Sequence, residues 1–84
     1  MADLNGTEPM LIDALGTLCP EPIIRIAKAI RPLAPGAHVR LLADDPGAER
    51  DLLDWSRATR HSIVSLEHGP GARIDALVCR RTDV

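Results

Sequence analysis

Aromatic residues are almost absent from this chain of 84 residues. It has no phenylalanine and no tyrosine, and Trp55 is its only tryptophan. Single-stranded bases bind to platforms of several exposed rings, so this scarcity argues against that kind of nucleic-acid binding. The hydrophobic share of 45% is nevertheless ordinary for a folded domain. The core must therefore be built from leucine, isoleucine, valine and alanine.

An excess of positive charge is absent as well. Ten lysines and arginines stand against twelve acidic residues, which gives a formal net charge of −2. A protein that binds nucleic acid through the phosphate backbone needs a broad basic surface. We therefore expect no direct nucleic-acid partner.

Long apolar runs are also missing. No stretch approaches the roughly 20 apolar residues that span a bilayer. The first five residues, MADLN, lack the basic start and apolar run of a signal peptide. The sequence predicts a cytoplasmic protein without a membrane partner.

Cysteine is limited to Cys19 and Cys79, too few for a disulfide scaffold. A reducing compartment would keep both as thiols, and Cys79 is expected to be a passive thiol on the last strand. No group of cysteine, histidine and carboxylate residues has metal-ligand spacing, so we expect no metal and no other cofactor. The three histidines are expected to be solvated surface residues.

The hydrophobic pattern predicts the element order β-α-β-α-β-β in a single domain spanning residues 1–84, with residues 1–9 as a flexible N-terminus. Two helices cannot cover both faces of so small a sheet. The expected fold class is therefore α+β, a two-layer sandwich with both helices on one face of a four-stranded mixed sheet. The predicted strands are residues 10–15, 38–43, 62–67 and 72–80, and the predicted helices are residues 20–33 and 46–60.

Cys19 directly precedes the first predicted helix, in the run CPEP. Unpaired N–H groups and the positive end of the helix dipole favour a thiolate at that place. Pro20 and Pro22 are tolerated in a first helical turn, but each removes an N–H group, and Glu21 adds negative charge nearby. The sequence therefore predicts a modestly lowered pKa for Cys19 and a nucleophile available near neutral pH.

Two acidic residues are expected to order the loops around this thiol. Asp13 is expected to accept backbone N–H groups of residues 16–19. Asp45 is expected to be the N-cap of the second helix, with Pro46 at its first position.

The exposed face of the first helix has two interpretations. Ile24 lies off the buried stripe, and with Arg25, Lys28 and Arg31 it would form a mixed apolar and basic docking rim. The alternative is an ordinary solvated helix face with one stray apolar residue. As a docking rim, it would suit an acidic partner surface, and Asp45 is a further possible docking residue.

Four segments, at residues 11–16, 19–22, 35–36 and 43–46, read LIDALG, CPEP, PG and ADDP. Together they resemble the TusA family of sulfur carriers, also called SirA-like, over residues 11–81. The resemblance implies that Cys19 receives sulfane sulfur as a persulfide, in a sulfurtransferase of the carrier type without separate acid–base machinery. The supporting motif residues that it implies are Asp13, Gly16, Pro20, Glu21 and Pro22.

The resemblance also implies protein partners. The donor would be a cysteine desulfurase or a rhodanese-like protein, and the acceptor a relay protein of the Tus or DsrE-like type. The pathway served would be tRNA 2-thiouridine synthesis, molybdenum-cofactor synthesis or sulfur oxidation, and these three stay open. A monomer is expected, since no apolar patch in the pattern requires a dimer.

Two other classes of function stay open. One is a redox-sensing or protein-interaction module of the same fold, although no resolving cysteine lies near Cys19 in sequence. The other is an RNA-binding module, which rests only on analogy with a small domain of a translation initiation factor. The acidic net charge and the missing aromatics weigh against the latter.

Overall fold

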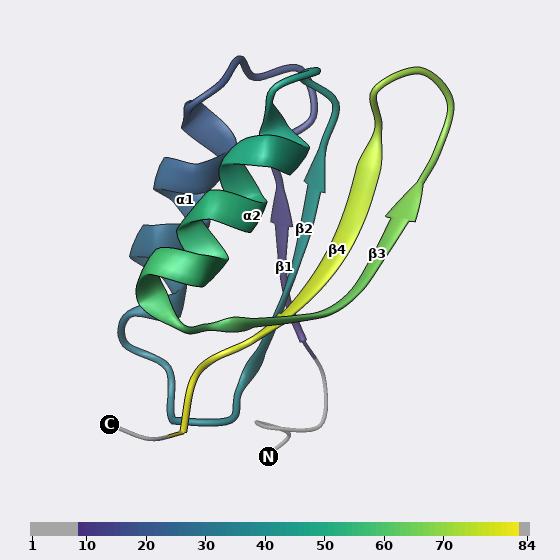
Figure 1. Ribbon diagram of the computed structural model, residues 1–84. Coiled ribbons are helices and arrows are strands. Elements are labelled where there is room, and N and C mark those ends of the chain that lie inside the picture. Colours follow the sequence, from purple (N-terminus) through teal and green to yellow (C-terminus); the bar gives the residue numbers. More distant parts are fainter. Residues whose placement is uncertain (1–8, 83–84) are drawn as a thin grey trace.

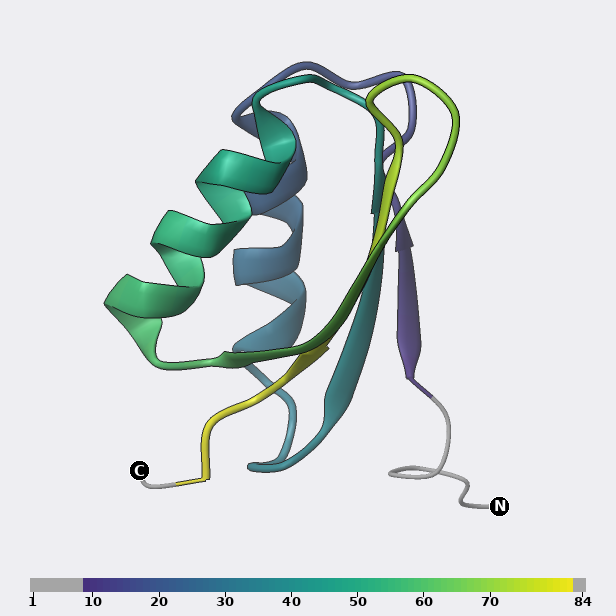
Figure 2. The same cartoon turned by 45° about the vertical axis from the view of Figure 1, so that its right-hand side comes forward.

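Both helices lie on one face of a four-stranded sheet in the computed structural model, which describes residues 9–82 (Figures 1 and 2). The fold class predicted from the sequence, a two-layer α+β sandwich with a mixed sheet, is thereby confirmed. The expectation of a flexible N-terminus concerns residues of which 1–8 lie outside the described range. The elements in chain order are β1 Met10–Asp13, α1 Glu21–Ile30, β2 His38–Ala43, α2 Ala48–Thr59, β3 Ser62–His68 and β4 Ile74–Cys79.

The strand order β1-β2-β4-β3 determines where the loops meet. β1 and β2 are neighbours and run parallel, whereas β4 is antiparallel to both β2 and β3. The carboxyl ends of two parallel neighbours lie at the same edge of a sheet. The loops from β1 into α1 and from β2 into α2 therefore lie side by side, at the top of both views (Figures 1 and 2).

The core between the two layers is aliphatic, as the composition predicts. β2 and β4 alternate strictly, with every second side chain facing the helices and buried. Trp55 is only partly buried and packs against the edge of this core. The buried hydrophobic residues are Ile12, Ala14, Ile26, Ile30, Val39, Leu41, Ala43, Ala48, Leu52, Ile74, Ala76 and Val78.

Four predicted elements, β1, α1, α2 and β4, were too long. β1 ends at Asp13 instead of residue 15, because Ala14 and Thr17 close a turn (N to O 3.2 Å). α1 ends at Ile30 instead of residue 33. β4 spans Ile74–Cys79 instead of residues 72–80, because the N–H of Gly69 binds the carbonyl of Arg73 across the hairpin turn (2.9 Å).

The start of α2 also differs from the prediction. The N-cap is Gly47, and the helix begins at Ala48 instead of Pro46. Asp45 acts one step earlier, since its Oδ2 accepts the N–H of Gly47 at 2.8 Å and its carbonyl accepts the N–H of Ala48 at 2.9 Å. Asp45 therefore orders the turn that leads into the helix.

The carboxyl ends of the helices are held by arginines after β4. Arg80 donates to the carbonyls of Ile30 and Arg31 at 3.1 and 3.3 Å, and Arg81 donates to the carbonyl of Thr59 at 3.3 Å. These carbonyls have no intrahelical partner, and cations favour that end of the dipole. In residues 9–82, neither helix has the length and apolarity needed to cross a bilayer.

Candidate thiol site

Cys19 lies in the loop between β1 and α1, at the edge where the two helices begin. Its side chain is exposed and its thiol is free. Leu18, immediately before it, is 75% exposed. The loop thus presents the sulfur beside an apolar side chain that the fold itself does not bury.

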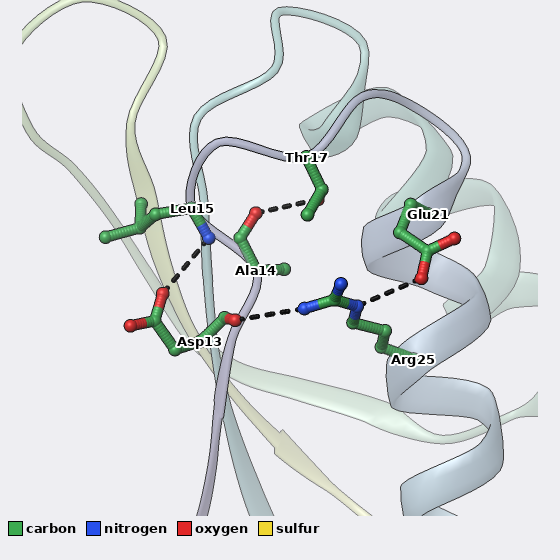
Figure 3. Close-up of polar contacts among 6 residues, drawn as sticks. All are labelled: Asp13, Ala14, Leu15, Thr17, Glu21 and Arg25. Carbon is green, nitrogen blue, oxygen red and sulfur yellow. Dashed lines mark hydrogen bonds and ion pairs between the residues drawn. The ribbon is translucent and has the colours of Figure 1, made fainter.

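Two carboxylates hold this loop in place. Asp13 Oδ1 accepts the N–H of Leu15 at 3.1 Å (Figure 3), and Asp44 Oδ1 accepts the N–H of Gly16 at 2.9 Å. The prediction that Asp13 binds the N–H groups of residues 16–19 is therefore wrong, because Asp44 from the neighbouring loop takes Gly16. Gly16 has a φ of +81°, in the left-handed region that favours glycine.

The two prolines of the CPEP run have different surroundings. Pro20 is exposed, follows Cys19 through a cis peptide bond, and is the N-cap of α1. Its carbonyl accepts the N–H groups of Ile23 and Ile24 at 3.0 and 3.1 Å. Pro22 is fully buried against the core. One proline therefore shapes the exposed turn at the thiol, and the other anchors the helix behind it.

Glu21 and Arg25 connect α1 to the end of β1. Arg25 Nε lies 3.0 Å from Glu21 Oε2, and its Nη1 donates to the carbonyl of Asp13 at 3.3 Å (Figure 3). In Figure 3 the guanidinium lies between these two acceptors. Arg25 is thus already engaged within the fold.

The remaining members of the predicted docking rim are spread along α1. Ile24 is 43% exposed, and Lys28 and Arg31 are also exposed. Because α1 rises about 1.5 Å per residue, Arg31 lies roughly 15 Å along the axis from the helix start. The structure places Ile24 and Arg25 near the thiol end, whereas Arg31 lies at the opposite end.

The thiol has an acidic partner that sequence reasoning missed. Cys19 Sγ donates a hydrogen bond to Oδ2 of Asp51, in the first turn of α2. Gly47, at the start of the same helix, is so close that a Cβ there would lie 3.5 Å from the sulfur. The parallel pairing of β1 with β2 could have indicated this contact, since it brings the loops after both strands together.

The pKa of Cys19 is raised from its ordinary value to about 11, and the predicted lowering is wrong. The hydrogen bond to Asp51 is the largest cause, followed by partial desolvation of the sulfur and by the negative charges of Asp51 and Asp45. A hydrogen bond donated by the neutral thiol stabilises that form, and nearby carboxylates disfavour a thiolate. These acids raise the pKa of Cys19 more than the dipoles of the helices that begin here lower it.

The other thiol lies at the opposite end of the molecule. Cys79 pairs with His38, the first residue of β2, whereas the Cys19 loop meets the carboxyl end of that strand. The sulfur of Cys79 is half-buried and lies 3.6 Å from the carbonyl oxygen of Gly36. Cys79 is therefore not a resolving thiol for Cys19 in this fold.

The histidines also lie away from the thiol contact. His61 is half-buried instead of solvated, since its ring packs on Trp55 at 5.3 Å and its Nδ1 accepts the N–H of Arg81 at 3.0 Å. Burial, then the charges of Arg80 and Arg81, lower the pKa of His61. His68 pairs with Glu49 at 2.8 Å. Among residues 9–82, no three potential ligands gather closely enough to hold a metal ion.

These features define a small two-layer α+β domain that presents one free thiol where two helices begin. Comparison with known families identifies the family to which the chain belongs. The model of the family described as sulfurtransferase TusA matches residues 10–78, and the chain belongs to this family. A SirA-like protein from Desulfitobacterium hafniense has a similar crystal structure, with a TM-score of 0.75 and 26% sequence identity over 86% of this chain and 97% of that chain.

Proposed function

We propose that this protein is a sulfur carrier that accepts sulfane sulfur as a persulfide on Cys19 and passes it to a partner protein. The observation that supports this most directly is the position of Cys19. It is an exposed free thiol in a loop within the segment that matches the sulfurtransferase family. The nearby exposed Leu18 and Ile24 offer apolar area to a docking protein.

The chemistry requires one nucleophilic sulfur and access. The Cys19 sulfur attacks the terminal sulfur of a donor persulfide, a new sulfur–sulfur bond forms, and the old one breaks with its electron pair on the donor cysteine. The sulfane sulfur moves without a net change of redox state. No external oxidant is consumed.

The proposed partners follow from the family. The donor is a cysteine desulfurase or a rhodanese-like protein, and the acceptor is a relay protein of the Tus or DsrE-like type, in tRNA thiolation, molybdenum-cofactor synthesis or sulfur oxidation. The proposal places the carrier in the cytoplasm, where a reducing environment keeps a thiol free. The candidate docking residues at the thiol end are Leu18, Ile24, Arg25 and Asp45, with Lys28 farther along α1.

Intact-protein mass spectrometry tests the proposal. The protein is incubated with a cysteine desulfurase and cysteine, or with thiosulfate and a rhodanese. We expect wild type and Cys79→Ser to gain one sulfur atom that a reductant removes, and Cys19→Ser to gain none. An unmodified wild type with every donor, or loading on Cys79 alone, would overturn the carrier function of Cys19 and favour the redox-sensing module.

A further inference from the structure

We propose that Asp51 is the base of the transfer step: it holds the proton of the Cys19 thiol in the resting carrier and accepts that proton when the sulfur attacks. The inference rests on the sulfur-carrier function proposed above. It concerns a residue in the first turn of α2, outside the CPEP segment that carries the thiol.

The geometry places the proton of the Cys19 thiol between the sulfur and the Asp51 carboxylate. Cys19 Sγ donates to Asp51 Oδ2, and this contact joins residues 32 positions apart in the chain. The sulfur also lies where a Cβ on Gly47 would be 3.5 Å away, so α2 approaches the thiol through its backbone as well. A residue with a side chain at position 47 would occupy the space next to the sulfur.

The other acidic groups around the thiol are not placed to accept its proton. Asp45, in the loop before α2, acts on the thiol only through its charge, and its carboxylate already accepts the N–H of Gly47. Asp44 accepts the N–H of Gly16. On α1, Glu21 is paired with Arg25. Asp51 is thus the carboxylate that contacts the sulfur itself.

In the resting carrier this arrangement masks the thiol. At neutral pH the proton stays on sulfur, because the S–H group is hydrogen-bonded to a carboxylate and a thiolate would face two acids. Cys19 is therefore shielded from adventitious electrophiles. Its raised pKa is consistent with that state.

During transfer the same contact supplies the proton acceptor. As Cys19 Sγ bonds to the terminal sulfur of the donor persulfide, its proton passes to Asp51 Oδ2. The donor sulfur–sulfur bond breaks with its electron pair on the donor cysteine, and that thiolate takes the proton from Asp51. The products are the Cys19 persulfide and a donor thiol, so atoms, electrons and protons balance.

The variant Asp51→Asn should change two reactions of Cys19 in opposite directions. It should speed alkylation, because the thiol is no longer masked, and slow sulfur uptake, because the proton acceptor is lost. Alkylation by iodoacetamide expels iodide, which takes up no proton, so it reports only the thiolate fraction, and the midpoint of its pH profile should fall from about 11 in wild type toward the ordinary thiol value. The rate at neutral pH should rise about tenfold, since a lower pKa gives more thiolate but a weaker nucleophile. Sulfur uptake from glutathione persulfide, followed by intact mass, should instead slow about tenfold or more, within the range for loss of a general base.

Asp54→Asn is the matched control. Asp54 lies one turn farther along α2, is exposed, and is 3.8 Å from Arg57 instead of contacting the thiol. We expect its alkylation profile and sulfur uptake to match wild type, and circular dichroism should show all three proteins folded. A merely structural role of Asp51 would move both reactions in the same direction.

The outcomes distinguish this inference from the carrier function. An Asp51→Asn variant whose alkylation profile is unchanged or moves to higher pH overturns the role of Asp51, as does a variant that takes up sulfur as fast as wild type. If wild-type Cys19 takes sulfur from neither glutathione persulfide nor a protein donor, the carrier function fails instead, and the base role in transfer fails with it. The alkylation profile would then still report whether Asp51 masks the thiol.

Discussion

At the scale of single residues, the site depends on contacts made by neighbours of Cys19 more than on the cysteine itself. Gly16 allows the loop to turn with φ at +81° while its N–H binds Asp44. Pro22 is buried and fixes the first turn of α1. Asp51, from the other helix, sets the protonation of the sulfur. Each of these residues acts on the thiol from a different segment of the chain.

Gly16→Ala should destabilise the protein by about 1–2 kcal/mol, because an L side chain disfavours the left-handed region by that amount. No atom lies within 4 Å of a Cβ at Gly16, so the cost comes from the backbone alone. Urea denaturation measures the free energy of unfolding. Gly69→Ala is the control, since Gly69 has no positive φ and the nearest atoms belong to the Arg73 side chain. Equal losses for both variants would refute the backbone explanation.

At the scale of helices and strands, the central pair β2 and β4 is joined on the sheet face opposite the helices. Arg40 and Asp75 form two hydrogen bonds, at 2.9 and 3.0 Å. In the register, Arg40 is opposite Leu77, so Asp75 is its diagonal neighbour. Diagonal neighbours on one face are within reach of long side chains. The pair therefore connects the two strands through their outer side chains.

This ion pair makes stability depend on pH. The hydrogen bond from Arg40 lowers the pKa of Asp75. A carboxyl group whose pKa is lower in the folded state stabilises the fold above its unfolded value, about 3.9, and loses that contribution as pH falls through the folded pKa. Asp75→Asn should therefore be less stable than wild type at neutral pH, and the difference should shrink in acid. Urea denaturation across a pH series measures it.

Asp54→Asn provides the control for this series. Asp54 and Arg57 form a long, well-exposed pair, and exposed pairs of this kind contribute little. Its unfolding free energy should follow that of wild type at each pH. A gap between Asp75→Asn and wild type that stays constant into acid would contradict the assignment to the Asp75 carboxylate.

The elements also show how far sequence reasoning reaches. The order of strands and helices, the buried faces of β2 and β4, and the position of the thiol before α1 could be predicted, because each follows from local patterning and proline placement. The contact between Cys19 and Asp51 could not, since it depends on the parallel pairing of β1 with β2. The predicted sign of the Cys19 pKa shift was wrong for the same reason. The dipole of α1 can be inferred from the local sequence, whereas the acid that opposes it, Asp51, comes from another element.

At the scale of the whole molecule, stability depends on a small aliphatic core. A domain of about this size buries only roughly 60–70% of the surface of its unfolded chain, so each core side chain carries a sizeable share. Leu52, on α2, is fully buried, whereas Leu53, its neighbour in sequence, is 38% exposed. The two leucines allow one test of where the core lies.

Leu52→Ala should lower the free energy of unfolding by about 2–5 kcal/mol, the usual range for emptying a buried leucine site. Leu53→Ala should cost well under half as much, because its side chain is already partly in water. Urea denaturation of the two variants measures the difference. Similar losses would mean that α2 does not pack on the sheet through the face that contains Leu52.

The only tryptophan of the chain, Trp55, lies one helical turn beyond Asp51, the residue that contacts the Cys19 sulfur. Trp55 is in the C-terminal half of α2, where its ring packs on His61 and lines a pocket with Arg80 and Arg81. Cys19 is at the edge where both helices begin. Intrinsic tryptophan fluorescence therefore comes from one indole whose surroundings depend on the packing of α2 against the sheet. Its emission therefore reports the unfolding of the protein through a single indole. No dye has to be attached to the Cys19 thiol for this measurement.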